Sequence, residues 1–176
     1  MSDSFTQVVT STTQITHNNG TFNTNDQTCQ FGIFNCNSTN TRTLTLGSSA
    51  ISLTRNGTAM TITNTGLTIT ANTAVITALY TATISAASVN MNGTSIAFTG
   101  PGVVTLSASG GRWNNITRTG TAALTDGFIV GGSVTATGTF TATGNSITNR
   151  ILVVSNVVGT ARGITAAAVS LTNVDF

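Results

Sequence analysis

The chain has 176 residues, only 6% of them charged, and contains neither Lys nor Glu. Its net charge of +2 comes from isolated arginines, which form no basic stripe for nucleic acid. Four aspartates far apart in sequence and a single histidine argue against a glycosidase carboxylate pair, a Ser-His-Asp triad and a metal cluster. We therefore expect no enzymatic activity, no cofactor and no specific nucleic-acid binding.

Residues 1–40 differ from the rest of the chain, because their apolar residues are sparse and follow no regular spacing. Residues 16–26 are almost entirely polar and include His17, which we expect to be a solvated loop residue. This region is predicted to be an N-terminal arm or irregular cap that becomes ordered against a neighbour. A disordered tail is the alternative.

Two cysteines, Cys29 and Cys36, bracket a short apolar segment that contains a glycine. A disulfide between them would close a small loop and stabilise the fold by about 2 to 3 kcal/mol in the chain-entropy model. A chain that folds in a reducing cytosol would instead keep two free, partly buried thiols. The spacing is not Cys-x-x-Cys, so it predicts neither a thioredoxin-like motif nor a zinc knuckle.

A small pattern repeats from residue 41 to about 110: two apolar residues separated by one residue, followed by a polar or glycine-containing turn. The i, i+2 spacing places both apolar side chains on one face of a short strand, and the frequent flanking threonines favour strands. Three such steps add up to about 22 or 23 residues, close to one coil of a three-sided β-solenoid. The apolar pairs are Leu44/Leu46, Ile51/Leu53, Met60/Ile62, Leu67/Ile69, Ala74/Ile76, Ala82/Ile84, Val89/Met91, Ile96/Phe98 and Val104/Leu106.

The repeat predicts an all-β fold, either a β-solenoid or an intertwined trimeric β-helix of short strands. A β-sandwich or barrel is the alternative, and the hairpin signal Asn56-Gly57 supports it. Against that alternative, several other breaks between apolar pairs have no tight-turn sequence, and strands this short make weak hairpins.

Residues 111–176 are predicted to be a less regular β region that ends in an apolar segment. Arg112, Trp113 and Arg118 cluster after Gly110-Gly111, and we expect this segment to form a subunit contact, because Trp and Arg are enriched at interfaces. A base- or sugar-stacking site is the alternative. The apolar end, including Val174 and Phe176, is expected to seal a subunit interface.

The first 20 residues contain no apolar core of a signal peptide, and the most apolar run, residues 151–158, is too short to span a bilayer. The composition nevertheless resembles that of extracellular proteins, being rich in Thr, Asn and Gly and poor in charge. Assembly into a virus particle and release by lysis is the simplest route that satisfies both observations.

Two tracts, residues 131–144 and 64–70, resemble β-helical segments of viral and phage surface proteins such as fibres, spikes, and head-fibre or cement proteins. This resemblance implies a homotrimer without catalytic residues that binds other virion structural proteins. It implies a fibre, spike or capsid decoration subunit, assembled in the host cytoplasm and located on the virion surface.

Two other functions remain open. The first is an extracellular microbial adhesin, or a subunit of a self-assembling filament or surface layer. The second is an ice- or carbohydrate-binding solenoid, because ranks of outward threonine can order water. The Thr-x-Thr pairs are Thr43/Thr45, Thr61/Thr63, Thr68/Thr70, Thr81/Thr83 and a run from Thr135 to Thr143.

Overall fold

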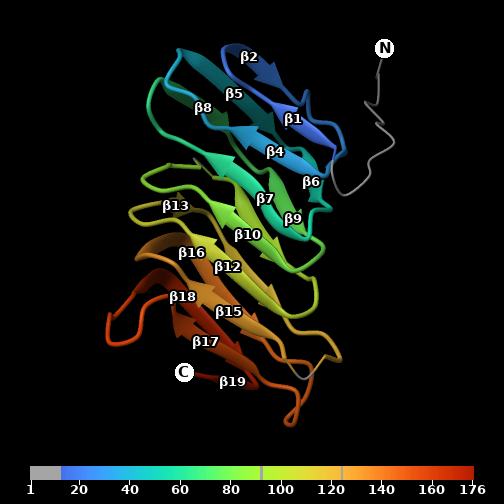
Figure 1. Cartoon of the computed structure of the whole chain (residues 1–176), viewed down its shortest axis with the longest axis vertical. Helices are drawn as coiled ribbons and strands as arrows, with labels where there is room; N and C mark the ends of the chain where they lie inside the picture. Colours follow the sequence, from blue (N-terminus) through green and yellow to red (C-terminus); the bar gives the residue numbers. More distant parts are fainter. Residues whose placement is uncertain (1–12, 92, 124) are drawn as a thin grey trace.

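The computed structural model describes residues 13–91, 93–123 and 125–176, and in this part of the chain it contains strands and no helix. The strands are parallel and stack as a β-solenoid of about six turns, from β1–β3 at one end to β17–β19 at the other (Figure 1). The all-β solenoid prediction is therefore confirmed. The part of the predicted N-terminal arm that covers residues 1–12 lies outside the described residues.

The solenoid has three faces, each a parallel sheet. Face A, with eight strands, contains β1 (Gln14–Thr16), β4 (Ile33–Cys36), β7 (Gly57–Ile62), β10 (Ala82–Ser85), β12 (Val103–Ser107), β15 (Gly127–Val130), β17 (Ile151–Ser155) and β19 (Val174–Asp175). Face B contains β2 (Gly20–Asn23), β5 (Arg42–Gly47) and β8 (Leu67–Ala71). Face C contains β3 (Cys29–Phe31), β6 (Ala50–Leu53), β9 (Val75–Ala78), β11 (Ser95–Phe98), β13 (Arg112–Trp113), β14 (Ile116–Thr119), β16 (Val134–Thr143) and β18 (Ile164–Thr172).

Each strand pairs with the strand one coil later rather than with its neighbour in sequence. On face A, Met60 pairs with Ile84, 24 positions on, and Ile84 pairs with Leu106, 22 positions on. The predicted coil of about 22 or 23 residues is close to these values. The sandwich alternative fails because Asn56-Gly57 does not close a hairpin: it forms a corner, after which β7 pairs in parallel with β4 and β10.

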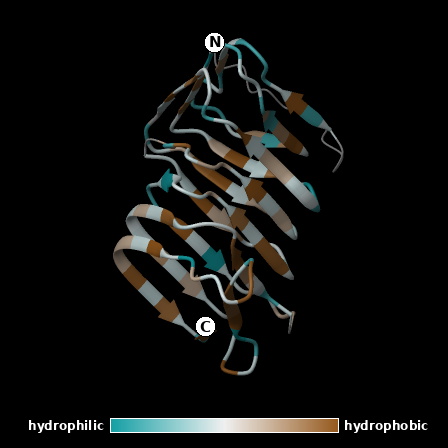
Figure 2. Cartoon of the chain, turned by 60° about the vertical axis from the view of Figure 1, so that its left-hand side comes forward, coloured by the Kyte–Doolittle hydropathy of each residue, from teal (hydrophilic) through white to brown (hydrophobic). Residues whose placement is uncertain are grey.

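The interior is built from the apolar pairs, whose side chains point inward because alternate residues of a strand face opposite sides. All of them are buried except Leu67 and Ile69, which are half-buried against the core. Figure 2 shows the resulting alternation of apolar and polar residues along the strands. Aromatic rings from successive coils pack on one another near both ends, in the contacts Phe22–Phe34, Phe31–Phe34, Phe98–Phe128 and Phe128–Phe140.

The solenoid begins earlier than the sequence pattern suggested. Strands β1, β2 and β3 form a first coil that pairs with β4, β5 and β6 of the second. The described part of residues 1–40 therefore belongs to the stack, and it carries the buried side chains of Phe31 and Phe34.

Candidate assembly surface

Arg118 is a buried residue that ties successive coils together. Its guanidinium donates hydrogen bonds to the carbonyl oxygens of Gly100 and Gly102, each at 2.8 Å, and lies 3.3 Å from the buried carboxylate of Asp126. Burial lowers the pKa of Arg118, and the neighbouring Asp126 partly offsets this effect. Asp126 also accepts a hydrogen bond of 2.6 Å from the Gly102 amide. This group has the geometry of a structural clamp.

Arg42 fills a second buried corner and donates mainly to backbone carbonyls. The acceptors include the oxygens of Cys36, Thr63 and Thr65, at 2.9, 2.6 and 2.7 Å. Its Nε also lies 3.2 Å from the Cys36 sulfur. These bonds satisfy carbonyls of consecutive coils where the chain turns between faces A and B.

His17 completes the same corner and is buried, so the expectation of a solvated loop histidine is wrong. Its Nε2 lies 3.1 Å from the carbonyl oxygen of Gly20 and donates a hydrogen bond to it, because a carbonyl oxygen can only accept. Its Nδ1 lies 3.6 Å from the Cys36 sulfur. Cys36 is 0% exposed, which leaves this thiol–imidazole pair without access for a substrate.

The two cysteines are free thiols, both buried, on different faces of the solenoid. Cys29 lies on β3 of face C, with its sulfur 3.6 Å from the carbonyl of Gln27. Burial raises the pKa of the Cys29 thiol. Cys36 lies on β4 of face A and has the partners described above.

The residues predicted to form a subunit contact separate into an interior group and a surface group. Trp113 is 1% exposed and Arg118 is buried, so both belong to the interior of the single chain and are not available to a partner. Arg112 is exposed on β13. At the end of the chain, Val174 is half-buried against the core and Phe176 is 78% exposed.

The outer face of face A changes from polar to apolar toward the C-terminal end. Val103, Gly127 and Leu152 are successive partners on the outside of β12, β15 and β17, and Ile129 and Val154 form a second such row. Together they line an open hollow, at whose edge Arg150 and Asp175 form an exposed ion pair of 2.8 Å. An exposed pair of this kind contributes at most about 1 kcal/mol.

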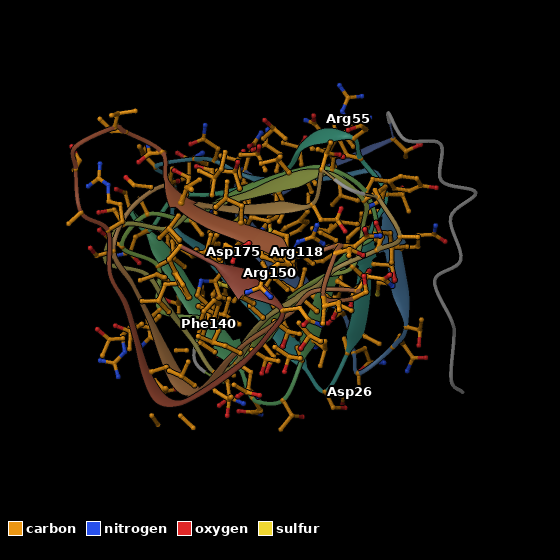
Figure 3. The ribbon with its side chains drawn as sticks, turned by 90° about the horizontal axis from the view of Figure 1, so that it is seen from below. Asp26, Arg55, Arg118, Phe140, Arg150 and Asp175 are labelled. Atoms are coloured by element: carbon orange, nitrogen blue, oxygen red, sulfur yellow. The ribbon has the colours of Figure 1, made fainter. Side chains whose placement is uncertain are left out.

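The C-terminal end of the solenoid leaves its interior uncovered. Val169 and Leu171 of β18 pair with Phe140 and Ala142 of β16, which are buried, so all four side chains point to the interior. Yet Val169 is 58% exposed and Leu171 is 42% exposed, since no strand among the described residues lies over them. They line a hollow of about 240 Å³ with Phe140, which lies inside the ring of coils when the molecule is seen from this end (Figure 3).

These two apolar regions are continuous, because Val154 lines both hollows. We call them together the C-terminal apolar surface, composed of Val103, Ile129, Leu152, Val154, Ile164, Val169, Leu171 and Phe176. An exposed apolar surface of this kind marks an interaction site in proteins.

Several Thr-x-Thr pairs stack in register on other faces. Thr43/Thr45 pairs with Thr68/Thr70 on face B, and Thr117/Thr119 pairs with Thr141/Thr143 on face C. Their side chains are exposed or half-buried on the outside. The pairs Thr61/Thr63 and Thr81/Thr83 do not stack in this way, since Thr83 pairs with Thr58 and Thr105.

No protein family, curated protein or solved structure matches the chain. The described residues hold no group of three or more His, Cys, Asp or Glu side chains that could bind a metal ion. Within the same residues, no helix is long and apolar enough to cross a membrane.

Proposed function

We propose that this chain is a non-enzymatic structural protein that assembles with copies of itself through the C-terminal apolar surface. The observation that carries this proposal is the uncovered interior of the last coil, where Val169 and Leu171 occupy core positions and remain exposed. Removing apolar side chains from water contributes roughly 25 cal/mol per Å² of buried area. Covering the exposed apolar side chains of the last coil with the surface of another chain should therefore be favourable in free energy.

The proposed setting is the surface of a virus or phage particle, as a fibre, spike or capsid decoration subunit. The low charge, the Thr/Asn/Gly-rich composition and the resemblance of residues 64–70 and 131–144 to such proteins support it. The resemblance implies a homotrimer, for which the outer row of face A offers a lateral apolar contact. A microbial adhesin or filament subunit would use the same surface in an extracellular setting.

The native mass tests self-assembly. Light scattering of the purified chain is expected to give a multiple of 17.9 kDa, and the double change Val169→Asp, Leu171→Asp should lower this mass, because it removes the contact at the last coil. Val158→Asp is the matched control, because Val158 is fully exposed in a loop and does not line the surface. A wild-type mass of 17.9 kDa at micromolar concentration would contradict the proposal.

The location on a particle needs a separate test. Virus particles purified from the source culture, washed in high salt and analysed by mass spectrometry, should contain peptides of this chain in a fixed ratio to the capsid protein. Recovery of the peptides only in the particle-free supernatant would favour the adhesin or filament function.

The stacked threonines support a second candidate function, the binding of ice. Two Thr-x-Thr pairs in register present four hydroxyls and four methyls, at strand spacings of about 4.8 Å. Thermal hysteresis that is present in the wild type and lost in Thr141→Tyr would support this function. No hysteresis in the wild type would remove it. For carbohydrate binding, the buried Trp113 offers no stacking surface.

A further inference from the structure

We infer that β18 pairs with β18 of a second copy, antiparallel and about a twofold axis, so that two solenoids join end to end at their C-terminal coils. This inference rests on the proposed self-assembly and specifies the contact at the open end. The partner is a second copy of this chain, recognised by backbone pairing and by the apolar side chains on the interior side.

The edge of β18 is available for pairing. Among the described strands, β18 pairs only with β16, so half of its amide and carbonyl groups face away from the sheet. It is nine residues long, contains no charged residue and no proline, and is exposed along most of its length. Soluble proteins normally protect such an edge with charges, prolines or a covering segment, because it is a template for pairing with another chain.

The side-chain pattern of β18 is self-complementary. The interior-facing residues are Ile164 and Ala166 before the centre and Val169 and Leu171 after it, in register with the buried Val134, Ala136, Phe140 and Ala142. In an antiparallel pair centred between Ala167 and Ala168, Ile164 lies opposite Leu171 of the second copy. Ala166 then lies opposite Val169. Every interior apolar residue of one strand therefore meets an interior apolar residue of the other.

The irregularity of β18 also fits this arrangement. The register with β16 shifts between the partners Ala166/Ala136 and Ala168/Thr139, so Ala167 has no partner in that ladder. Two consecutive residues, Ala167 and Ala168, then face outward, and both lie at the proposed centre. The break in alternation is thus symmetric about the axis, and small side chains occupy the point where the two copies approach most closely.

A head-to-tail contact with the first coil of another copy fits less well. At that end, β2 and β3 have four and three residues and are separated by a corner that contains Asn25 and Asp26, both with positive φ. Neither strand can pair along the whole of β18. A twofold contact is also the commonest symmetry of soluble oligomers, because the same patch serves both partners.

Cysteine cross-linking tests the register. Thr165 and Ser170 are exposed and lie opposite each other in the proposed pair, so a mixture of Thr165→Cys and Ser170→Cys chains should form a disulfide-linked dimer under mild oxidation. Each variant alone should not cross-link at this contact. In a pair of identical chains, the introduced cysteine of one copy is offset by five positions, roughly 17 Å, from the introduced cysteine of the other. The native cysteines are buried and are present equally in every sample.

Efficient cross-linking in the mixture alone, abolished by adding Leu171→Asp to both chains, supports the twofold pair. Cross-linking of either single variant with itself, or none in the mixture while light scattering still gives a multimer, would overturn the pairing and leave the proposed self-assembly intact. A monomeric wild type would overturn both. A trimeric contact through face A uses other residues, so a native mass of six chains, with disulfides that each join two of them, would also support the pair.

Discussion

At the scale of single residues, the polar interior serves to join coils. Arg42 and Arg118 are buried at corners, where the chain leaves one face and carbonyl groups of consecutive coils turn inward. A guanidinium carries five donors in a fixed plane and can satisfy several such carbonyls at once. We infer that these arginines are structural residues, in keeping with an interior that has no access for a substrate.

Replacing Arg42 by Met should therefore destabilise the chain by about 3 kcal/mol, because the buried carbonyl of Cys36 would lose its donor and the partly buried hydrogen bonds to Thr63 and Thr65 would be lost. Urea denaturation followed by circular dichroism measures the change. Arg112→Met at the exposed residue of β13 is the control and should change stability by less than about 0.5 kcal/mol. If Arg42→Met and Arg112→Met change the free energy of unfolding equally, Arg42 does not stabilise the corner between faces A and B as proposed.

Cys29 gives a prediction for alkaline pH. Burial raises its pKa in the folded chain, so folding favours the neutral thiol. The stability that the neutral thiol contributes is fully present below the pKa of the unfolded chain, about 8.5. It is lost as the pH rises through the higher pKa of the folded chain. With reducing agent present, the free energy of unfolding should fall more steeply above about pH 8.5 in the wild type than in Cys29→Ala. If the free energy of unfolding depends on pH in the same way in both proteins, burial of the Cys29 thiol does not raise its pKa.

At the scale of elements, the corners between strands tolerate fewer residue types than the strands do. Gly66 has φ +65, and a Cβ there would lie 2.5 Å from the carbonyl oxygen of Asn40 in the preceding coil. Gly20 has a nearly identical φ of +69 but open space around the same position. The two glycines therefore separate the effect of backbone conformation from that of close coil stacking.

Gly20→Ala should cost about 1 to 2 kcal/mol, the price of a left-handed conformation for a residue with a side chain. Gly66→Ala should cost clearly more, since the contact is with backbone that cannot move without separating two coils. Thermal unfolding of both variants measures the difference. If the two midpoints fall by the same amount, the coils are not packed as closely at this corner as the structure indicates.

The strands were predictable from the sequence, and the first coil was not. Apolar pairs such as Ile51/Leu53 repeat at a regular spacing, and the spacing alone specifies inward strands. In the first coil, Phe22 has no apolar residue two positions away, and within its strand Phe31 is paired only with Cys29, whose place in a strand the sequence did not indicate. Burial of His17 and Thr24 depends on partners from other coils, Cys36 and Leu46, which no local pattern indicates.

At the scale of the whole molecule, the solenoid has two different ends. Its first coil contains the buried Phe31 and the half-buried Ile15 and Phe22, whereas its last coil exposes interior positions. The sequence predicted that the apolar C-terminus seals a subunit interface. Val174 is half-buried and Phe176 is exposed at this end, and their role in an interface stays a prediction. It could not place Trp113 and Arg118 in the interior, because an Arg/Trp cluster has the same composition in an exposed loop and in a buried corner.

The most direct test of the account is hydrogen–deuterium exchange of the β18 amides, measured at high and low protein concentration. If the last coil assembles through backbone pairing of β18, the amides of residues 164–172 that face away from β16 should be protected at high concentration and exchange faster on dilution. The double variant Val169→Asp, Leu171→Asp should show fast exchange at both. Fast exchange of these amides in the wild type at every concentration, while the β16 amides stay protected, would contradict the central claim.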